Sequence, residues 1–497
     1  MNKSKTIEID PVTRVEGDLK FQAQYDDNGI ISNAWSSGSM FRGFERFLIG
    51  KKPMDALGIT PRICGMCSAA QSYVCSNALR DLFQVEMPAN GYHIKNIVLG
   101  IENIQNHFTH FYLLFGPDLA HSRYKKNPSY NRVVKRFSSN GESYKRFIEL
   151  RNDFMNMMGI FGGRWPHNLA MQPGGTSEIL NDRLRLNYGH GHFLAFKEGI
   201  ENLFLGCTLE QWLKIDTREK LDIYIEKQKG KSDLSVFLKA GLEYGLDTLG
   251  KGPGKYISAG AYDLTDGSSL FKPGFFDKTI KTFSHLHIKE AVRFSFFEDE
   301  KTLSRHPFEG KTHPFSSENK EKYSWVKAPR YQGKVVETGP LARMIIHQDP
   351  LVFNLFKEKG ASVWLRVFAR FQEALLTLSI LNHWILSLEI NAPNINHWEE
   401  VKSGEGVGLG GAARGILGHW IQVEKGLISN YQVITPTAIN ASPRDDNNLP
   451  GPIEMAAIGT KVQDETDPLE LLHIIRSYDP CLVCSCHAVK PMDDGCQ

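Results

Sequence analysis

The chain has 497 residues, of which 41% are hydrophobic and 23% are charged. This balance is typical of a globular protein with a large core, and it excludes a disordered or fibrous chain. Lys and Arg together number 58, and Asp and Glu 56, which leaves a net charge of +2. Because no long basic run occurs, the sequence indicates no nucleic-acid partner.

Nothing in the sequence predicts direct membrane insertion. Residues 1–8 have no apolar signal core, and no run of about twenty apolar residues occurs. The nearest run, residues 374–388, is interrupted by Asn382 and His383 and predicts a buried helix. We therefore expect a soluble, cytoplasmic protein, with any membrane association made through a partner.

The predicted elements are mostly helical. Residues 7–35 alternate in short strands around Asp26-Asp27-Asn28-Gly29, a hairpin signal, and residues 94–115 carry apolar positions at helical spacing. The polar stretch 297–325 predicts solvated surface, and a long buried helix is expected over residues 362–390. The sequence thus predicts a single large α+β domain, predominantly α, with peripheral β-hairpins.

Two cysteine pairs lie at opposite ends of the chain. Arg62-Ile63-Cys64-Gly65-Met66-Cys67 is near the start, and Asp479-Pro480-Cys481-Leu482-Val483-Cys484 is near the end. Four thiolates that converge suit a soft transition metal. Spacing alone also fits a structural zinc site, but zinc modules are short and these pairs span nearly the whole chain.

The residues around the pairs form longer patterns than zinc binding needs. RxCGxC near the start and DPCxxCxxH near the end resemble the two signatures of nickel–iron hydrogenase large subunits. The resemblance extends to intermediate blocks along the chain and implies a core of long helices that brings both ends to a buried centre.

The resemblance implies a nickel–iron centre whose iron carries carbon monoxide and cyanide. Cys64, Cys67, Cys481 and Cys484 would bind nickel, with Cys67 and Cys484 bridging to iron. Cys64 and Cys481 would be terminal thiolates able to accept a proton. These diatomic ligands follow from the family resemblance and not from any spacing.

Two further residues resemble catalytic positions of the family. Glu16, in Asp10-Pro11-Val12-Thr13-Arg14-Val15-Glu16-Gly17, matches a proton-relay glutamate, and burial would raise the pKa of such a carboxyl. The alternative for Glu16 is a solvated strand residue. Arg414 follows a glycine-rich stretch, Gly404 to Gly411, and matches an arginine that points at the metals.

Other residues are implied to support the centre. Thr437 would hydrogen-bond one cyanide, and Asp118 and Asp479 would fix Arg414. Gln71, where many relatives carry His, resembles the cytoplasmic uptake and hydrogen-sensing branch, as does Arg476. Glu45, in Phe41-Arg42-Gly43-Phe44-Glu45, and His487 match ligands of a magnesium or iron ion; Glu45 is otherwise an Arg42 partner or a surface charge.

The implied function is that of a catalytic subunit that splits H2 into protons and electrons. This chain lacks the cysteine spacing for iron–sulfur clusters, so the resemblance implies a small subunit that carries them. The alternative is an H2-sensing subunit that signals through a partner. We expect residues 1–487 to form the domain. Nickel-insertion proteins would act first, and a maturation endopeptidase would then remove residues 488–497.

Overall fold

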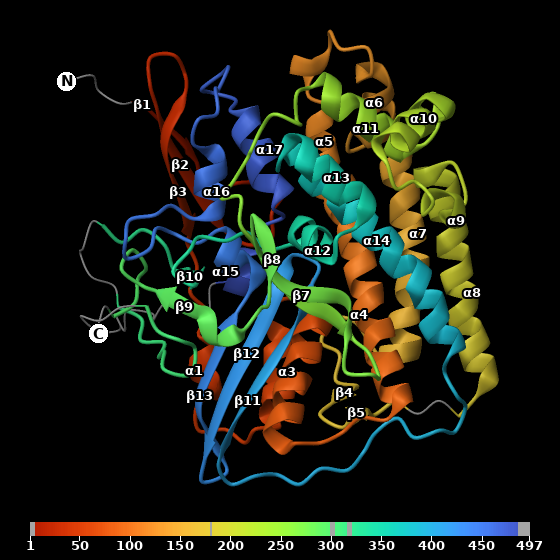
Figure 1. Ribbon diagram of the computed structural model, residues 1–497, viewed down its shortest axis with the longest axis vertical. Coiled ribbons are helices and arrows are strands. Elements are labelled where there is room, and N and C mark those ends of the chain that lie inside the picture. The colour runs from red at the N-terminus through yellow and green to blue at the C-terminus, as the bar shows by residue number, and fades with distance from the viewer. Residues whose placement is uncertain (1–4, 179–180, 299–303, 316–320, 486–497) are drawn as a thin grey trace, which may run out of the picture.

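Long helices form one half of the molecule in the computed structural model, which describes residues 5–178, 181–298, 304–315 and 321–485. They are α4 (Ala89–Thr109), α7 (Glu142–Gly162), α8 (Arg183–Ile200) and α14 (Val363–Leu386), and Figure 1 shows them side by side. α14 and α7 both pack against α4, and α8 packs against α7. Almost every residue of α14 up to Ile385 is buried, which confirms the predicted buried helix.

The other helices are shorter and connect or cover these: α1 (Phe44–Leu48), α2 (Asp55–Ile59), α3 (Ser68–Phe83), α5 (Gly116–Leu119), α6 (Tyr130–Phe137), α9 (Leu209–Trp212), α10 (Arg218–Gln228), α11 (Asp233–Glu243), α12 (Pro340–His347), α13 (Pro350–Lys359), α15 (Pro436–Asn440), α16 (Pro452–Ala457), α17 (Leu469–Ser477) and α18 (Leu482–Ser485). A π-helical segment, His110–Phe115, continues α4, so residues 94–115 are helical as predicted.

The strands form small antiparallel sheets: β1 (Lys5–Ile9), β2 (Leu19–Tyr25) and β3 (Ile31–Gly38); β4 (Met171–Gln172) and β5 (Gly175–Thr176); β6 (Tyr256–Asp263), β7 (Ser269–Asp277) and β8 (Thr279–Lys281); β9 (Ile288–Ala291) and β10 (Ala328–Tyr331); and β11 (Gly404–Ala412), β12 (Gly415–Glu424) and β13 (Leu427–Ile434). Tyr25 pairs with Ile31 across the predicted hairpin turn. The fold is the expected α+β domain.

The glycine-rich strand β11 packs directly on α3 (Figure 1). A Cβ at Gly406 would lie 2.3 Å from the carbonyl oxygen of Ala78, and one at Gly408 would lie 2.0 Å from that of Val74. Only glycine permits this approach. The glycines are therefore strand residues that bring the sheet onto α3, and the β11–β12 turn carries Arg414 inward.

The prediction of solvated surface for residues 297–325 is wrong for several described residues. Thr312, Lys322 and Ser324 are buried. The Lys322 ammonium donates to the carbonyl oxygens of Ser295 at 2.8 Å and Phe297 at 3.0 Å. The polar composition suggested exposure, but the Lys322 ammonium can be buried because backbone carbonyl oxygens accept its hydrogen bonds.

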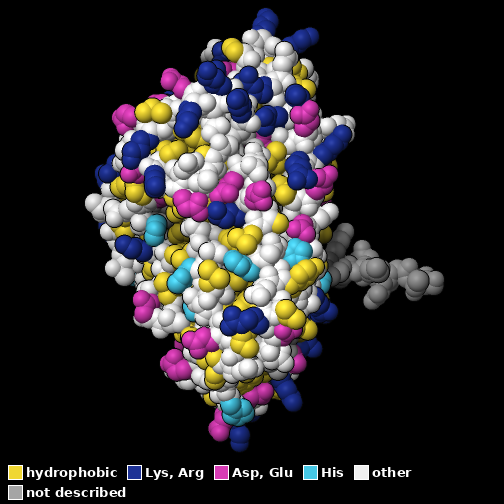
Figure 2. Space-filling view, turned by 90° about the vertical axis from the view of Figure 1, so that its right-hand side faces the viewer, with side chains coloured by type: hydrophobic (Ala, Val, Ile, Leu, Met, Phe, Trp, Pro, Cys, Tyr) yellow, Lys and Arg dark blue, Asp and Glu magenta, His cyan; other side chains and the backbone are white. Residues whose placement is uncertain are grey.

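Side chains of both charges are interspersed with apolar ones on the face shown in Figure 2, with Lys and Arg more frequent at its top. Within the described ranges, no helix combines the length and apolar character needed to cross a bilayer.

Candidate metal centre

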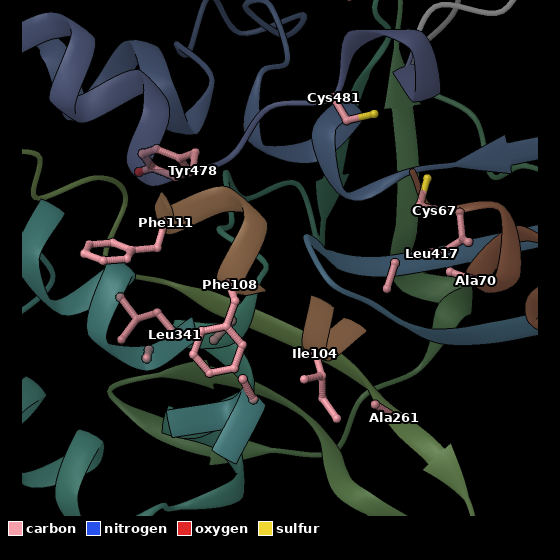
Figure 3. Packing of buried hydrophobic residues seen from close by; sticks show 14 of the residues in the cluster. Cys67, Ala70, Ile104, Phe108, Phe111, Ala261, Leu341, Leu417, Tyr478 and Cys481 are labelled. Atoms are coloured by element: carbon pink, nitrogen blue, oxygen red, sulfur yellow. The ribbon is translucent and has the colours of Figure 1, made fainter. Parts of the chain in front are cut away.

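The four predicted cysteines converge. Their sulfur atoms all lie within 4.8 Å of one another, and all four residues are buried. Sγ of Cys67 lies 3.1 Å from that of Cys484, and Sγ of Cys481 lies 3.5 Å from that of Cys64. Figure 3 shows the sulfur atoms of Cys67 and Cys481 projecting toward the same space from opposite ends of the chain.

Backbone pairing joins the two ends. Cys67 immediately precedes α3, and Cys481 precedes α18, which carries Cys484. Glu16 pairs with Cys481 in parallel: its N–H donates to Pro480 O at 3.3 Å, and its carbonyl accepts from Leu482 N at 2.6 Å. The segment around Glu16 therefore runs parallel to the segment that carries Cys481.

Glycine is required where these segments meet. Gly17 has a φ of +82°, and a Cβ there would lie 2.7 Å from Val483 N. Both the left-handed backbone and the close contact exclude other residues without a shift.

Arg42 clamps both cysteine segments. Its guanidinium donates to Ile63 O at 2.5 Å and Arg62 O at 3.2 Å, beside Cys64, and to Val483 O at 3.2 Å, between Cys481 and Cys484. From its sequence context, Arg42 is predicted only as a possible partner of Glu45. The resemblance of residues 41–45 to a family block was the only sequence signal for Arg42. Its carbonyl partners lie in distant segments that only the fold brings together.

The thiols are electrostatically coupled. Burial raises the pKa of Cys481 and of Cys484, whereas hydrogen bonds from Cys481 and its neighbours hold the pKa of Cys64 well below its usual range. Adjacent buried thiolates repel one another, so full ionisation of the cluster needs a compensating cation. The donor set fits a bound soft metal.

Arg414 supplies fixed positive charge beside the sulfurs. Its Nε donates to Asp479 O at 3.0 Å and its Nη2 to Asp479 Oδ1 at 3.1 Å. Burial opposes the charge of Arg414, but Asp479 and the cysteine sulfurs outweigh burial and raise the pKa of Arg414. The predicted Arg414–Asp479 contact is therefore present.

A small cavity adjoins the cluster. Cys67, Cys481 and Cys484 line it with Arg414, Gln71 and Thr437, and the remaining walls are Ala412, Leu417 and Pro436. Nη1 of Arg414 is buried and has no hydrogen-bond partner among the described residues. An unpartnered donor beside a thiol-lined cavity fits a cofactor that carries a hydrogen-bond acceptor.

Thr437 lines the same cavity as Cys481 and Arg414. Its hydroxyl accepts a hydrogen bond from the Cys481 backbone N–H at 2.9 Å. A hydroxyl that accepts one bond still has its own hydrogen to donate. Thr437 therefore orders the Cys481 backbone and keeps a donor for the cavity that it lines.

Glu16 is half-buried next to the cluster, not a solvated strand residue. Burial raises its pKa, and negative charge on Cys64 raises it further. A carboxyl with a raised pKa binds and releases a proton closer to neutral pH, as a proton relay requires.

The expectation that Asp118 fixes Arg414 is wrong. Asp118 pairs with Arg14, and its Oδ2 lies 2.5 Å from Nη1 of Arg476. Both carboxylate oxygens are thus engaged by other guanidiniums. Asp118 joins the N-terminal block to α17, and the second partner of Asp479 is Arg370, whose Nη1 lies 3.3 Å from Asp479 Oδ2.

Glu45 lies in a second buried site. It is 2% exposed, its Oε1 accepts from Val433 N at 2.9 Å, and its Oε2 contacts Thr312 and lies 3.4 Å from Lys327 Nζ. A cavity here is also lined by Glu290 and Ser485. Lys327 Nζ also lies 3.4 Å from Glu290 Oε2, so its ammonium already lies between the two buried carboxylates, and Glu45 is no surface charge. His487 lies outside the described residues.

Two further supporting residues had not been predicted. Arg370 lies in the apolar helix α14, where a buried arginine signals a required partner. Glu102 of α4 accepts from Ala69 N and Ala70 N, each at 2.8 Å, and so caps the first turn of α3 just after Cys67. No local pattern identifies Glu102, because its partners are more than thirty residues away.

The fold and the site define a metalloprotein built around a buried four-thiol centre. The sequence model of the nickel-dependent hydrogenase family matches residues 42–122 and 118–487, and a HoxL-like model matches residues 6–36. The chain belongs to the nickel-dependent hydrogenase family, and it is the catalytic large subunit of a nickel–iron hydrogenase that oxidises H2.

Curated relatives match over nearly the full length. The large subunit of the periplasmic [NiFeSe] hydrogenase of Desulfomicrobium baculatum is 31% identical over 97% of this chain and 95% of its own. The hydrogenase-2 large chain of Escherichia coli is 30% identical over 98% of both chains, and the uptake hydrogenase large subunit of Rhodobacter capsulatus is 28% identical over 98% and 96%.

Solved structures agree with these matches. The H2-activated [NiFeSe] hydrogenase of Dm. baculatum superposes with a TM-score of 0.85 at 30% identity, covering 98% of this chain and 100% of that chain. The reduced enzyme of D. vulgaris Hildenborough has a TM-score of 0.82 at 31% identity, with the same coverage. This chain has cysteine at all four cluster positions.

Proposed function

We propose that Cys64, Cys67, Cys481 and Cys484 bind a nickel–iron centre, with Cys67 and Cys484 bridging to an iron that carries carbon monoxide and cyanide. The orphaned Nη1 of Arg414, which lies at the thiol-lined cavity, is the observation that best supports this assignment. Arg414 and Thr437 would donate to the cyanides. The bound centre supplies the redox chemistry that removes two electrons from H2.

Infrared spectroscopy and metal analysis of the purified complex test this proposal. We expect nickel and iron in the complex, and carbonyl and nitrile bands in the infrared spectrum. Stoichiometric zinc without those bands would refute the assignment, because a tetrathiolate zinc site has neither ligand.

The protein's own residues would move the protons. The Glu16 backbone pairs with Cys481, and burial and the charge of Cys64 raise the pKa of the Glu16 carboxyl, so this acidic group lies near the proposed terminal thiolates. The Arg414 guanidinium, held by Asp479, keeps its charge and orients the site. Glu16, half-buried and with a raised pKa, would carry protons onward.

Glu16→Gln tests the relay. The substitution keeps size but cannot ionise, so we expect nickel, iron and infrared bands to remain while H2 oxidation and H/D exchange are lost. Para-/ortho-hydrogen conversion needs no proton exit and should persist in part. Asp18→Asn, two residues away and exposed, is the control. Wild-type exchange in Glu16→Gln would exclude Glu16 from the path.

We further propose that electrons pass to a small subunit with iron–sulfur clusters. The Cys64–Cys67 loop reaches the surface: Arg62 is exposed, and a Cβ at Gly65 would meet no atom within 4 Å. A partner seated there would come close to the thiols, and His167, whose pKa is lowered by burial and by Arg62, would lie at its edge.

Glu45, with His487, would bind magnesium or iron, and Glu290 would line the same cavity. We propose that a maturation endopeptidase cleaves after His487 once nickel-insertion proteins have acted. The mature chain would then end at His487, and an intact mass that includes residues 488–497 in fully active enzyme would contradict this.

Gln71 and Arg476 support assignment to the cytoplasmic uptake or H2-sensing branch. The two functions differ in rate and in partner binding. Rapid H2 oxidation with an artificial acceptor would indicate the uptake enzyme, whereas intact infrared bands with slow turnover and H2-dependent binding of a partner would indicate the sensor.

A further inference from the structure

One of the four clustered cysteines stands at the start of helix α3. Cys67 holds the N-cap position, just before Ser68, the first residue of the helix. A side chain at this position ordinarily accepts a hydrogen bond from the second or third backbone N–H of the helix. The Cys67 side chain makes no such bond, and its Sγ lies 3.1 Å from Sγ of Cys484. The first turn of α3 therefore needs another acceptor.

Glu102 of α4 is that acceptor. Its Oε2 accepts from Ala69 N and its Oε1 from Ala70 N, each at 2.8 Å. These N–H groups belong to the second and third residues of α3, so Glu102 receives the hydrogen bonds that an N-cap side chain would take. Oε2 of Glu102 also accepts from Nε1 of Trp165 at 2.9 Å, and Glu102 is 0% exposed. All three partners donate, so the carboxylate, which only accepts, is the form that fits them.

We propose that Glu102 is a positioning residue that replaces the N-cap side chain of α3, and so leaves the Cys67 thiolate to the metals, and that its negative charge lowers the reduction potential of the centre. Without Glu102, the N–H groups of Ala69 and Ala70 would be buried donors that attract the nearby thiolate. The inference rests on the proposed metal centre.

The charge of Glu102 is coupled to the thiols. Burial raises the pKa of Glu102 to about 7, its three hydrogen bonds lower it, and negative charge on Cys64 raises it. Such coupling is mutual, so a carboxylate at Glu102 favours the more positive, oxidised state of a centre bound by these thiols. One unit charge about 10 Å away, at an effective dielectric constant of about 20, changes the ratio of two states by about tenfold.

Glu102→Gln tests both effects in the purified complex. Glutamine has nearly the same size but no charge, and its single oxygen can serve Ala69 and Trp165 only by turning an N–H toward Ala70 N. At pH 8, where wild-type Glu102 is mostly ionised, we expect a shifted nickel electron paramagnetic resonance signal. At a fixed potential, we also expect the ratio of reduced to oxidised centre to rise about tenfold, or about 59 mV for one electron.

Glu454→Gln is the matched control. Glu454 is also 0% exposed and accepts three hydrogen bonds, from Ser36 N and the Tyr323 hydroxyl at 2.8 Å and from Gly451 N at 3.0 Å. Burial likewise raises the pKa of Glu454 to about 7, while the charge of Arg444 lowers it. Because its partners lie outside α3, this variant should lose stability yet keep the wild-type spectrum and potential at equal nickel content.

Glu102→Asp separates the charge from the cap. It keeps the charge on a shorter side chain, so its potential should stay nearer to the wild-type value than that of Glu102→Gln. Nickel-replete Glu102→Gln with the wild-type spectrum and potential would overturn the inference. Equal loss of nickel in Glu102→Gln and Glu454→Gln would also overturn it, whereas loss in Glu102→Gln alone would support the cap. Absence of nickel and of infrared bands in the wild type would instead overturn the proposed centre.

Discussion

Cys484→Ser removes nickel from the purified complex and abolishes H2 oxidation. Serine is a hard donor, and its hydroxyl stays protonated at neutral pH, whereas a thiolate ligand is soft and charged. The sulfur of Cys484 lies 3.0 Å from that of Cys481 and 3.1 Å from that of Cys67, so its loss breaks the four-thiol set at its centre. We expect nickel to fall below about a tenth of the wild-type content.

Cys207→Ser is the control for Cys484→Ser. Cys207 is only partly buried and belongs to no thiol cluster among the described residues. Elemental analysis of both variants, normalised to chain, gives the comparison. Wild-type nickel in Cys484→Ser would show that the cluster holds metal through the other thiols alone.

Arg414→Lys lowers turnover by about 10²-fold or more, the range for loss of a preorganised electrostatic group. Lysine keeps the charge but not the planar fork, so it cannot donate to both Asp479 oxygens and still direct a third N–H into the cavity. The metals should still assemble, because Arg414 is not a thiol donor. Turnover per nickel, with an artificial acceptor, is the measurement.

Arg366→Lys is the control that separates the loss of turnover in Arg414→Lys from the general effect of losing a buried guanidinium. Arg366 is 3% exposed and binds Glu337 through two N–H groups, at 2.7 and 2.8 Å. It should cost stability yet leave turnover per nickel near the wild-type value. Near-normal turnover in metal-replete Arg414→Lys would remove Arg414 from the proposed role.

Several features could be predicted because they depend on the residue spacing and composition of short segments. The two cysteine pairs and their flanking residues predict a converging four-thiol site, and the structure brings all four sulfur atoms together. The turn at residues 26–29 and the apolar run of α14 are likewise local signals, read from spacing and composition.

Side-chain partners were less predictable. Asp118 pairs with Arg14 and Arg476 and not with Arg414, and Arg42 holds the carbonyls of both cysteine segments. The polar stretch 297–325 contributes the buried Thr312 to the Glu45 site. A charged residue is equally compatible with solvent or with a buried partner until the fold brings that partner within reach.

The sequence by itself determined the donor set and the family, since four cysteines at these spacings carry the chemistry wherever they converge. Only the tertiary structure decided that the Glu16 backbone lies alongside Cys481 and that Gln71 is held by His419. It also decided that one N–H of Arg414 has no partner among the described residues. The physical reason is that such contacts join segments hundreds of residues apart, and their geometry depends on packing across the whole core.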